Sequence, residues 1–110
     1  MMSKTIMLVC AAGMSTSLLV TKMLNAAKAK NLDIDIFATS SSEAEQAVAS
    51  RTIDAMLLGP QVRFLESEYT KKFGNQGIPV SVINMSDYGM MNGEKVLQAG
   101  LNLIENQGGN

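Results

Sequence analysis

Residues 5–17 read TIMLVCAAGMSTS, and this stretch decides the fold. Thr5 to Val9 form a β-branched and apolar run, which is typical of a buried strand, and Cys10 ends it. Small and hydroxyl residues follow, and after them comes the apolar stripe of a helix. This stripe consists of Leu19, Met23, Ala26 and Ala27. We therefore expect a strand, a tight loop and a helix in this order.

The rest of the chain alternates between strand and helix patterns in the same way. Further strand patterns cover residues 32–36, 55–58 and 80–83. Further helical patterns begin at Ser40 or Ser42, at Pro60 and before Leu97. For the first of these helices, Ser40 is spaced from Glu43, and Ser42 from Glu45, as in a capping box. Residues 84–92 are expected to form a loop.

The order of the strands in the sheet follows from their polarity. Alternating βα units imply a parallel sheet with right-handed crossovers and helices on both faces. The strands at residues 5–9 and 55–58 are apolar throughout, so they belong at the centre. The second strand carries Asp33 and Asp35 and the fourth carries Ser81, so these two are edge strands. The predicted fold class is α/β, with a four-stranded parallel sheet of order 2-1-3-4.

This sheet has one position that suits a ligand. We expect residues 1–110 to form a single three-layer domain, because the chain has no linker or repeat. In such sheets the ligand crevice lies at the carboxyl ends of the strands, where the strand order reverses. That point falls between the first and third strands, and Cys10 ends the first. Cys10 is therefore the first candidate for a functional residue.

The composition excludes several classes of function. The 110 residues include one cysteine and no histidine, and their net charge is −1. The chain therefore lacks an internal disulfide, a Ser-His-Asp or Cys-His catalytic unit and the common histidine-containing zinc sites. It also lacks the basic face of a nucleic-acid-binding protein. No basic leader or apolar run of roughly 20 residues is present, so we expect a soluble cytoplasmic protein without metal or cofactor.

The segment after Cys10 is suited to holding an anion. It contains one glycine, two alanines and three hydroxyl residues before a helix, so its backbone N–H groups can converge above the helix N-terminus. The positive end of the helix also favours the thiolate, which is the nucleophilic form of a cysteine. The segment matches neither a dinucleotide fingerprint nor a Walker loop. The predicted phosphate loop consists of Ala11, Ala12, Gly13, Met14, Ser15, Thr16 and Ser17.

The position six residues after Cys10 separates two kinds of chemistry. A thiol phosphatase has an arginine there, whereas this chain has Thr16. A guanidinium stabilises the transition-state phosphate through bidentate hydrogen bonds, so its absence favours holding a phosphocysteine over hydrolysing it. Asp87 could act as a phosphatase's general acid, but we favour Asp87 and Tyr88 as loop-surface residues that shape partner docking. Gln61 could also reach the site from the turn after the third strand.

The residues from Cys10 to Leu19, CAAGMSTSLL, resemble the active loop of the IIB components of the bacterial sugar phosphotransferase system, lactose/cellobiose family. Residues 57–61, LLGPQ, and Tyr88-Gly89 are similar to that family's turns after the third and fourth strands. The resemblance implies a phosphoryl relay. A phosphohistidine of a IIA partner donates to Cys10, and the phosphocysteine then donates to a sugar that enters through a membrane IIC partner.

The resemblance also implies a flavodoxin-like fold similar to that of low-molecular-weight tyrosine phosphatases, and transient association with the inner face of the membrane through IIC. The sugar is expected to be a disaccharide of the cellobiose, chitobiose or lactose type, bound by the membrane partner. Met14, Met90 and Met91 could form an apolar rim for docking near the active edge. The helix faces that carry Glu43 and Glu45 are interpreted as solvated.

Two alternatives remain open from the residues alone. The first is a low-molecular-weight thiol phosphatase or arsenate-reductase-like enzyme that uses Cys10 and Asp87. The second is a non-catalytic flavodoxin-like interaction or redox-sensing module in which Cys10 is merely small and buried. A phosphoryl carrier would gain one phosphoryl group on Cys10, and a phosphatase would hydrolyse an aryl phosphate with turnover. A non-catalytic module would do neither, and its cysteine would be alkylated slowly.

Overall fold

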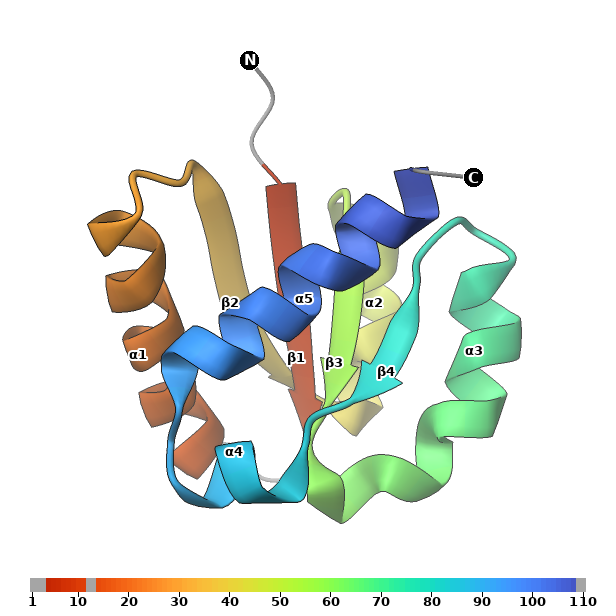
Figure 1. The fold of residues 1–110 in the computed structure, drawn as a ribbon. Helices are drawn as coiled ribbons and strands as arrows, with labels where there is room; N and C mark the ends of the chain where they lie inside the picture. The colour runs from red at the N-terminus through yellow and green to blue at the C-terminus, as the bar shows by residue number, and fades with distance from the viewer. Residues whose placement is uncertain (1–3, 12–13, 109–110) are drawn as a thin grey trace.

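The computed structural model describes residues 4–11 and 14–108 of the chain, and Figure 1 shows their arrangement. The strands are β1 (Lys4–Cys10), β2 (Ile34–Ser40), β3 (Ala55–Leu58) and β4 (Val80–Val82). The helices are α1 (Met14–Ala29), α2 (Ala44–Ser50), α3 (Glu66–Gly74), α4 (Met85–Gly89) and α5 (Gly93–Gly108). Two 3-10 turns, η1 (Ser41–Glu43) and η2 (Pro60–Leu65), directly precede α2 and α3.

The four strands form one parallel sheet of order β2-β1-β3-β4, which confirms the predicted order. β1 pairs with β2 along its whole length, from Lys4 beside Ile34 to Cys10 beside Ser40. On its other side β1 pairs with all four residues of β3. Residues 6–10 of β1 and all of β3 are buried, as expected for central strands covered on both faces.

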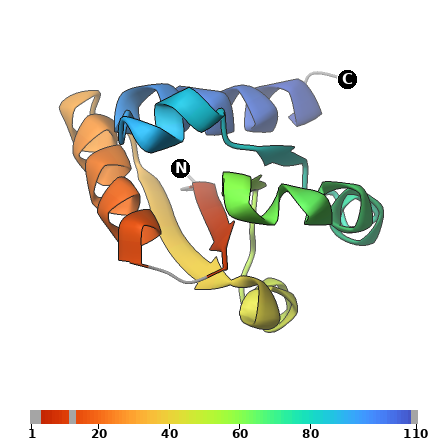
Figure 2. The same ribbon diagram turned by 90° about the horizontal axis from the view of Figure 1, so that it is seen from below.

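Helices cover both faces of the sheet and bury two separate cores. Figure 2 shows α5 on one side of the sheet and α2 on the other. Ile6 and Leu8 of β1 point into the core beneath α1 and α5, which also contains Leu19 and Leu97. Met7 and Val9, the alternate residues of β1, point into the core beneath α2 and α3. Alternate side chains of β1 therefore belong to the two cores, one on each face of the sheet.

The helix α1 packs unusually closely against α5. A Cβ atom added at Gly93, the first residue of α5, would lie 2.5 Å from the carbonyl carbon of Lys22 in α1. A Cβ atom added at Gly100 would lie 2.7 Å from Cδ1 of Ile6 in β1. An ion pair between Lys30, which directly follows α1, and Glu94 in the first turn of α5 has its N and O atoms 3.5 Å apart. The start of α5 is therefore held close to α1, and the middle of α5 is held close to β1.

Three local predictions were wrong. Residues 84–92 are not an uninterrupted loop, because Met85–Gly89 form α4. The side chain of Asn84 caps this helix by accepting a hydrogen bond from the backbone N–H of Asp87. No capping box opens the second helix, since the Ser40 hydroxyl lies 3.0 Å from that of Ser42 and makes no cap hydrogen bond. The second strand was predicted at residues 32–36, whereas β2 runs from Ile34 to Ser40. The third helical segment does begin at Pro60, as predicted, and its first part is the 3-10 turn η2.

Candidate functional site

Cys10 lies at the carboxyl end of β1, at the point where the strand order reverses. Its neighbours in the sheet are Ser40, the last residue of β2, and the end of β3 on the other side. The side chain is 3% exposed, and its thiol donates a weak hydrogen bond to the carbonyl oxygen of Thr39, with sulfur and oxygen 3.6 Å apart. The predicted location of Cys10 at the switch point of the sheet is therefore confirmed.

A small hollow of about 190 Å³ lies beside the Cys10 thiol. Its lining includes the hydroxyl residues Ser17 from α1 and Thr39 and Ser40 from β2. Glu43, from the turn η1, completes the rim. Glu43 is exposed, as the sequence pattern predicted, but its position beside Cys10 was not predicted. The arrangement gives the thiol a polar, anion-sized space with hydroxyl groups on two sides and one carboxylate at its edge.

The predicted phosphate loop, Ala11 to Ser17, overlaps the start of α1 in the structure. Ala12 and Gly13 lie outside the described residues, and Met14 to Ser17 form the first turn of α1. The first N–H groups of a helix have no partner within it and carry its positive end. The first turn of α1 contains no acidic residue that would compete for these groups. This first turn begins four residues after Cys10, so its N–H groups lie at the same end of the sheet as the thiol.

Thr16 and Tyr88 meet in the interior, behind the first turn of α1. The Thr16 side chain is fully buried, and its hydroxyl lies 3.1 Å from the Tyr88 hydroxyl. Tyr88 is 8% exposed and belongs to the core beneath α1 and α5. The prediction of Tyr88 as a loop-surface residue was therefore wrong. The local sequence gave no sign of this contact, because the two residues are 72 positions apart.

Asp87 and Gln61, the two other predicted accessory residues, lie near Tyr88. Asp87 is half-buried in α4, and it is not among the residues that line the hollow beside Cys10. Gln61 is exposed in η2, where its Oε1 atom lies 3.2 Å from the place of a Cβ atom at Gly59. Gln61 and Tyr88 share a second hollow of about 360 Å³. This hollow is also lined by Pro60, Arg63, Met85 and Gly89.

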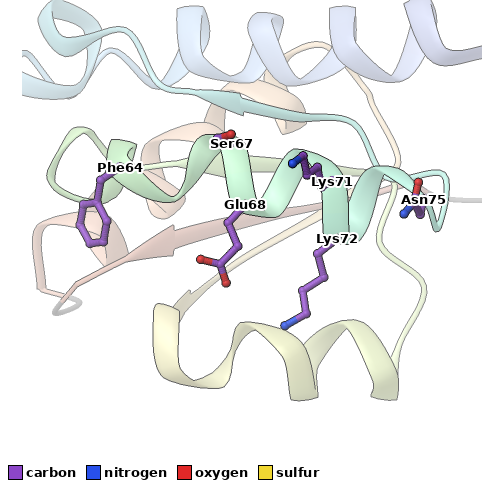
Figure 3. Close-up of a pocket in the computed structure, with 6 residues that line it drawn as sticks. All are labelled: Phe64, Ser67, Glu68, Lys71, Lys72 and Asn75. Atoms are coloured by element: carbon purple, nitrogen blue, oxygen red, sulfur yellow. The ribbon is translucent and has the colours of Figure 1, made fainter.

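Size alone does not locate the site in this molecule. A hollow of about 600 Å³ lies along α3, as Figure 3 shows, and it contains none of the predicted site residues. Its lining residues are Phe64, Ser67, Glu68, Lys71, Lys72 and Asn75. The ammonium group of Lys72 is 3.1 Å from a carboxylate oxygen of Glu45 in α2, so this charge is paired within the chain. The chemistry-bearing group, Cys10, lines a smaller space at the end of the sheet.

Metal sites and membrane spans are two further features that bear on function. No group of three or more His, Cys, Asp or Glu side chains in the described part of the chain could hold a metal ion. Within residues 4–11 and 14–108, no helix has the length and apolar character needed to cross a membrane.

The fold and the site together define a class of α/β proteins in which a cysteine lies at the switch point of a parallel sheet, beside the first turn of a helix. The model of the family described as "PTS system, Lactose/Cellobiose specific IIB subunit" matches residues 5–99. The chain belongs to this family of the phosphotransferase system. This confirms the family that the loop motif, CAAGMSTSLL, resembles.

Two curated relatives and one solved structure support the same assignment. The galactose-specific EIIB component of Lactococcus lactis subsp. cremoris is 50% identical over 94% of this chain and 99% of its own length. The cellobiose-specific EIIB component of Lactococcus lactis subsp. lactis shows the same identity and coverage. The cellobiose-specific IIB component of Borrelia burgdorferi is 42% identical, with a TM-score of 0.79 over 96% of this chain and 95% of that one.

Membership of the family defines the class of activity. The chain is a sugar-specific IIB component, and such components are phosphotransferases that carry a phosphoryl group and pass it to a sugar. They work together with IIA and IIC partners. The comparisons lend no support to the thiol phosphatase or the non-catalytic module that the residues alone left open.

Proposed function

We propose that Cys10 is the residue that carries the phosphoryl group. The observation that carries this proposal is the place of its thiol, which lies at the switch point of the sheet and lines a polar hollow with Ser17 and Ser40. The residues around it fit a phosphate cradle, since the first turn of α1 offers the backbone N–H groups of a helix N-terminus and Ser17 offers a hydroxyl. Ala11 to Ser17 are the proposed phosphate-binding segment.

The relay runs in two displacements at phosphorus. In the first, the Cys10 thiolate attacks the phosphoryl group of a IIA phosphohistidine, the S–P bond forms, the P–N bond breaks, and the histidine leaves with the electron pair. In the second, a sugar hydroxyl attacks the phosphocysteine, an O–P bond forms, the S–P bond breaks, and the hydroxyl proton is lost to solvent or base. Such transfers depend mainly on alignment and electrostatic stabilisation, which the cradle supplies.

The absence of arginine from position 16 suits a carrier better than a hydrolase. Thr16 is buried and paired with Tyr88, so this position presents no guanidinium to a phosphate. Asp87, the residue proposed as a phosphatase's acid, is not among the residues that line the hollow beside Cys10. A phosphocysteine held here therefore lacks the arginine and the aspartate that the phosphatase hypothesis requires, which favours its persistence until the sugar arrives.

Partner docking is proposed at the same end of the molecule. Figure 1 shows that the start of α1, the turn η2 and helix α4 all lie at the end where β1 finishes. Large apolar side chains are exposed on these elements, namely Leu18, Phe64, Met85 and Met90. Met90, at 73% exposed, fits the predicted apolar rim, whereas Met91 packs partly into the core and the side chain of Met14 lies outside the described residues.

The partners proposed for this surface are a IIA phosphohistidine protein and a membrane IIC permease. The location proposed is the cytoplasm, with transient association at the inner face of the membrane through IIC. The substrate proposed is a disaccharide of the cellobiose, chitobiose or lactose type, which the cellobiose-specific relative supports, whereas the galactose-specific relative is named for a monosaccharide. Their equal identity to this chain favours neither sugar.

The proposal is tested by incubating the chain with a phosphorylated IIA protein of the same system and measuring its intact mass. The wild type is expected to gain one phosphoryl group, and the Cys10→Ser variant is expected to gain none. Retained unfolding behaviour in Cys10→Ser serves as the control for its fold. A wild type that stays unmodified while the donor remains phosphorylated would overturn the proposal, as would sustained hydrolysis of an aryl phosphate.

A further inference from the structure

A buried hydrogen bond joins the first turn of α1 to α4. The Thr16 and Tyr88 hydroxyls lie 3.1 Å apart, and both side chains are withdrawn from solvent. Removing one member of such a pair takes this hydrogen bond away from the other in the interior, where losing a hydrogen bond is costly. The contact also spans 72 residues of sequence, so it ties together two elements that the chain connects only through the rest of the fold.

Thr16 lies in the helical turn whose position determines how the N–H groups of α1 face the Cys10 thiol. It belongs to the same helical turn as Ser17, which lines the hollow beside Cys10. While Ser17 faces that hollow, Thr16 faces the interior, because successive helical residues point about 100° apart. Rotation or translation of this turn would therefore move its N–H groups and the Ser17 hydroxyl relative to the Cys10 thiol.

Tyr88 is held rigidly enough to serve as an anchor. Asn84 caps the start of α4 through the N–H of Asp87, at 3.0 Å, and the N–H of Asn92 donates to the carbonyl of Asp87 at 2.8 Å after the helix ends. Met91 adopts a left-handed φ of 53° to make this ending. The Tyr88 ring also passes Gly59, where an added Cβ atom would lie 3.9 Å from Cε1 of the ring. The anchor thus rests against the end of β3.

We propose that the Thr16–Tyr88 hydrogen bond positions the first turn of α1 over Cys10, so that Tyr88 is a positioning residue for phosphoryl transfer. This inference rests on the proposed role of Cys10. Tyr88 acts through Thr16 rather than on the phosphoryl group. The pair is expected to raise the rate of transfer without changing how the phosphorylated donor binds.

The test compares four variants of the full chain in single-turnover transfer from a phosphorylated IIA protein, where kcat stands for the maximal rate constant and KM for the half-saturating donor concentration. Tyr88→Phe and Thr16→Val each remove one hydroxyl and keep the shape of the side chain, and each is expected to lower kcat about tenfold with KM within about twofold. The kcat of the double variant is expected to be no lower than that of the less active single variant, because both substitutions remove the same contact. Thr16→Ser keeps the hydroxyl, and it is expected to retain at least about one third of wild-type kcat.

A second readout does not depend on transfer. Amide hydrogen exchange in the second turn of α1 is expected to be about tenfold faster in Tyr88→Phe than in the wild type, with exchange in α3 unchanged. Wild-type kcat in Tyr88→Phe would overturn the inference. So would a much greater loss in Thr16→Val that multiplies in the double variant, since Thr16 would then be a direct phosphate ligand. If the wild type accepts no phosphoryl group, the proposed function fails, and unchanged exchange in Tyr88→Phe would separately overturn the positioning role.

Discussion

The two helical layers of this protein are built differently. On the face covered by α1 and α5, a Cβ atom added at Gly93 would meet the backbone of Lys22, and one added at Gly100 would meet the side chain of Ile6. On the face covered by α2 and α3, a Cβ atom added at Gly74 would meet no other atom within 4 Å, and a hollow of about 600 Å³ lies along α3. The α2–α3 contact at the surface is an ion pair between two exposed side chains, Lys72 and Glu45.

The more closely packed layer is also the one that contains the residues beside Cys10. The tight layer contains α1, whose first turn faces the Cys10 hollow, and Tyr88, which is bonded to that turn. A phosphate cradle must be held within a fraction of an ångström, so close glycine contacts and a buried hydrogen bond suit this layer. The other layer closes the second core around Tyr69 and Phe73, whose rings meet edge to face at 5.0 Å. It is expected to support stability without setting the geometry of transfer.

The largest expected effect is on stability, and it is measured by replacing one glycine in each layer with alanine. Gly93→Ala is expected to lower the free energy of unfolding by about 3 kcal/mol, because the new Cβ atom meets the backbone of Lys22. Gly74→Ala, the matched control in α3, is expected to leave stability unchanged or raise it by up to about 1 kcal/mol. Urea unfolding of both variants measures the contrast. Equal destabilisation of the two would remove the distinction between the layers.

A functional effect of the looser side is expected at Phe64, which precedes α3 in η2 and is 75% exposed. Phe64→Ser is expected to raise KM for the phosphorylated IIA donor about fivefold, with kcat and stability nearly unchanged, because a docking side chain is lost. Leu32→Ser is the control, since Leu32 is an exposed apolar residue before the start of β2. A fall in kcat with constant KM would instead place Phe64 in the transfer step.

The smallest expected effect concerns alkaline pH. Burial, together with the nearby carboxylates of Glu68 and Glu45, raises the pKa of Tyr69, and Lys72 offsets this in part. A raised pKa in the folded state means that the folded protein holds the phenol proton more tightly than the unfolded chain does. The stability it contributes is therefore present below about pH 10 and lost as pH rises above that value. Tyr69→Phe is expected to flatten this loss in unfolding measured from about pH 9 to 11, whereas an unchanged slope would contradict it.

Much of the fold could be predicted because single residues carried the signal. The uninterrupted apolar runs of β1 and β3 indicated central strands, and Asp33, Asp35 and Ser81 indicated edges, which together define the order of the sheet. This order then located Cys10 at the switch point. The five residues of α4 are too few to show helical periodicity, so its existence depends on the Asn84 cap, and the sequence pattern predicted a loop there.

The parts of the site that the sequence did not reveal are contacts between distant segments. Tyr88 follows an aspartate in a segment predicted as a loop, and its burial beside Thr16 results from a contact with a residue 72 positions away. Glu43 reaches the Cys10 hollow because η1 directly follows β2 at the same edge of the sheet. Neither contact leaves a local pattern. By contrast, the role of Cys10 followed from a local motif, and it remains a prediction that chemistry must test.

The most direct test of the central claim is to locate the phosphoryl group on the chain. After reaction with a phosphorylated IIA protein, peptide mapping by mass spectrometry under conditions that preserve phosphocysteine is expected to place the group on Cys10, within the peptide that contains residues 5–22. Subsequent addition of the sugar with its IIC partner should remove it. A phosphoryl group on another residue, or none on a chain whose donor is fully phosphorylated, would contradict the account.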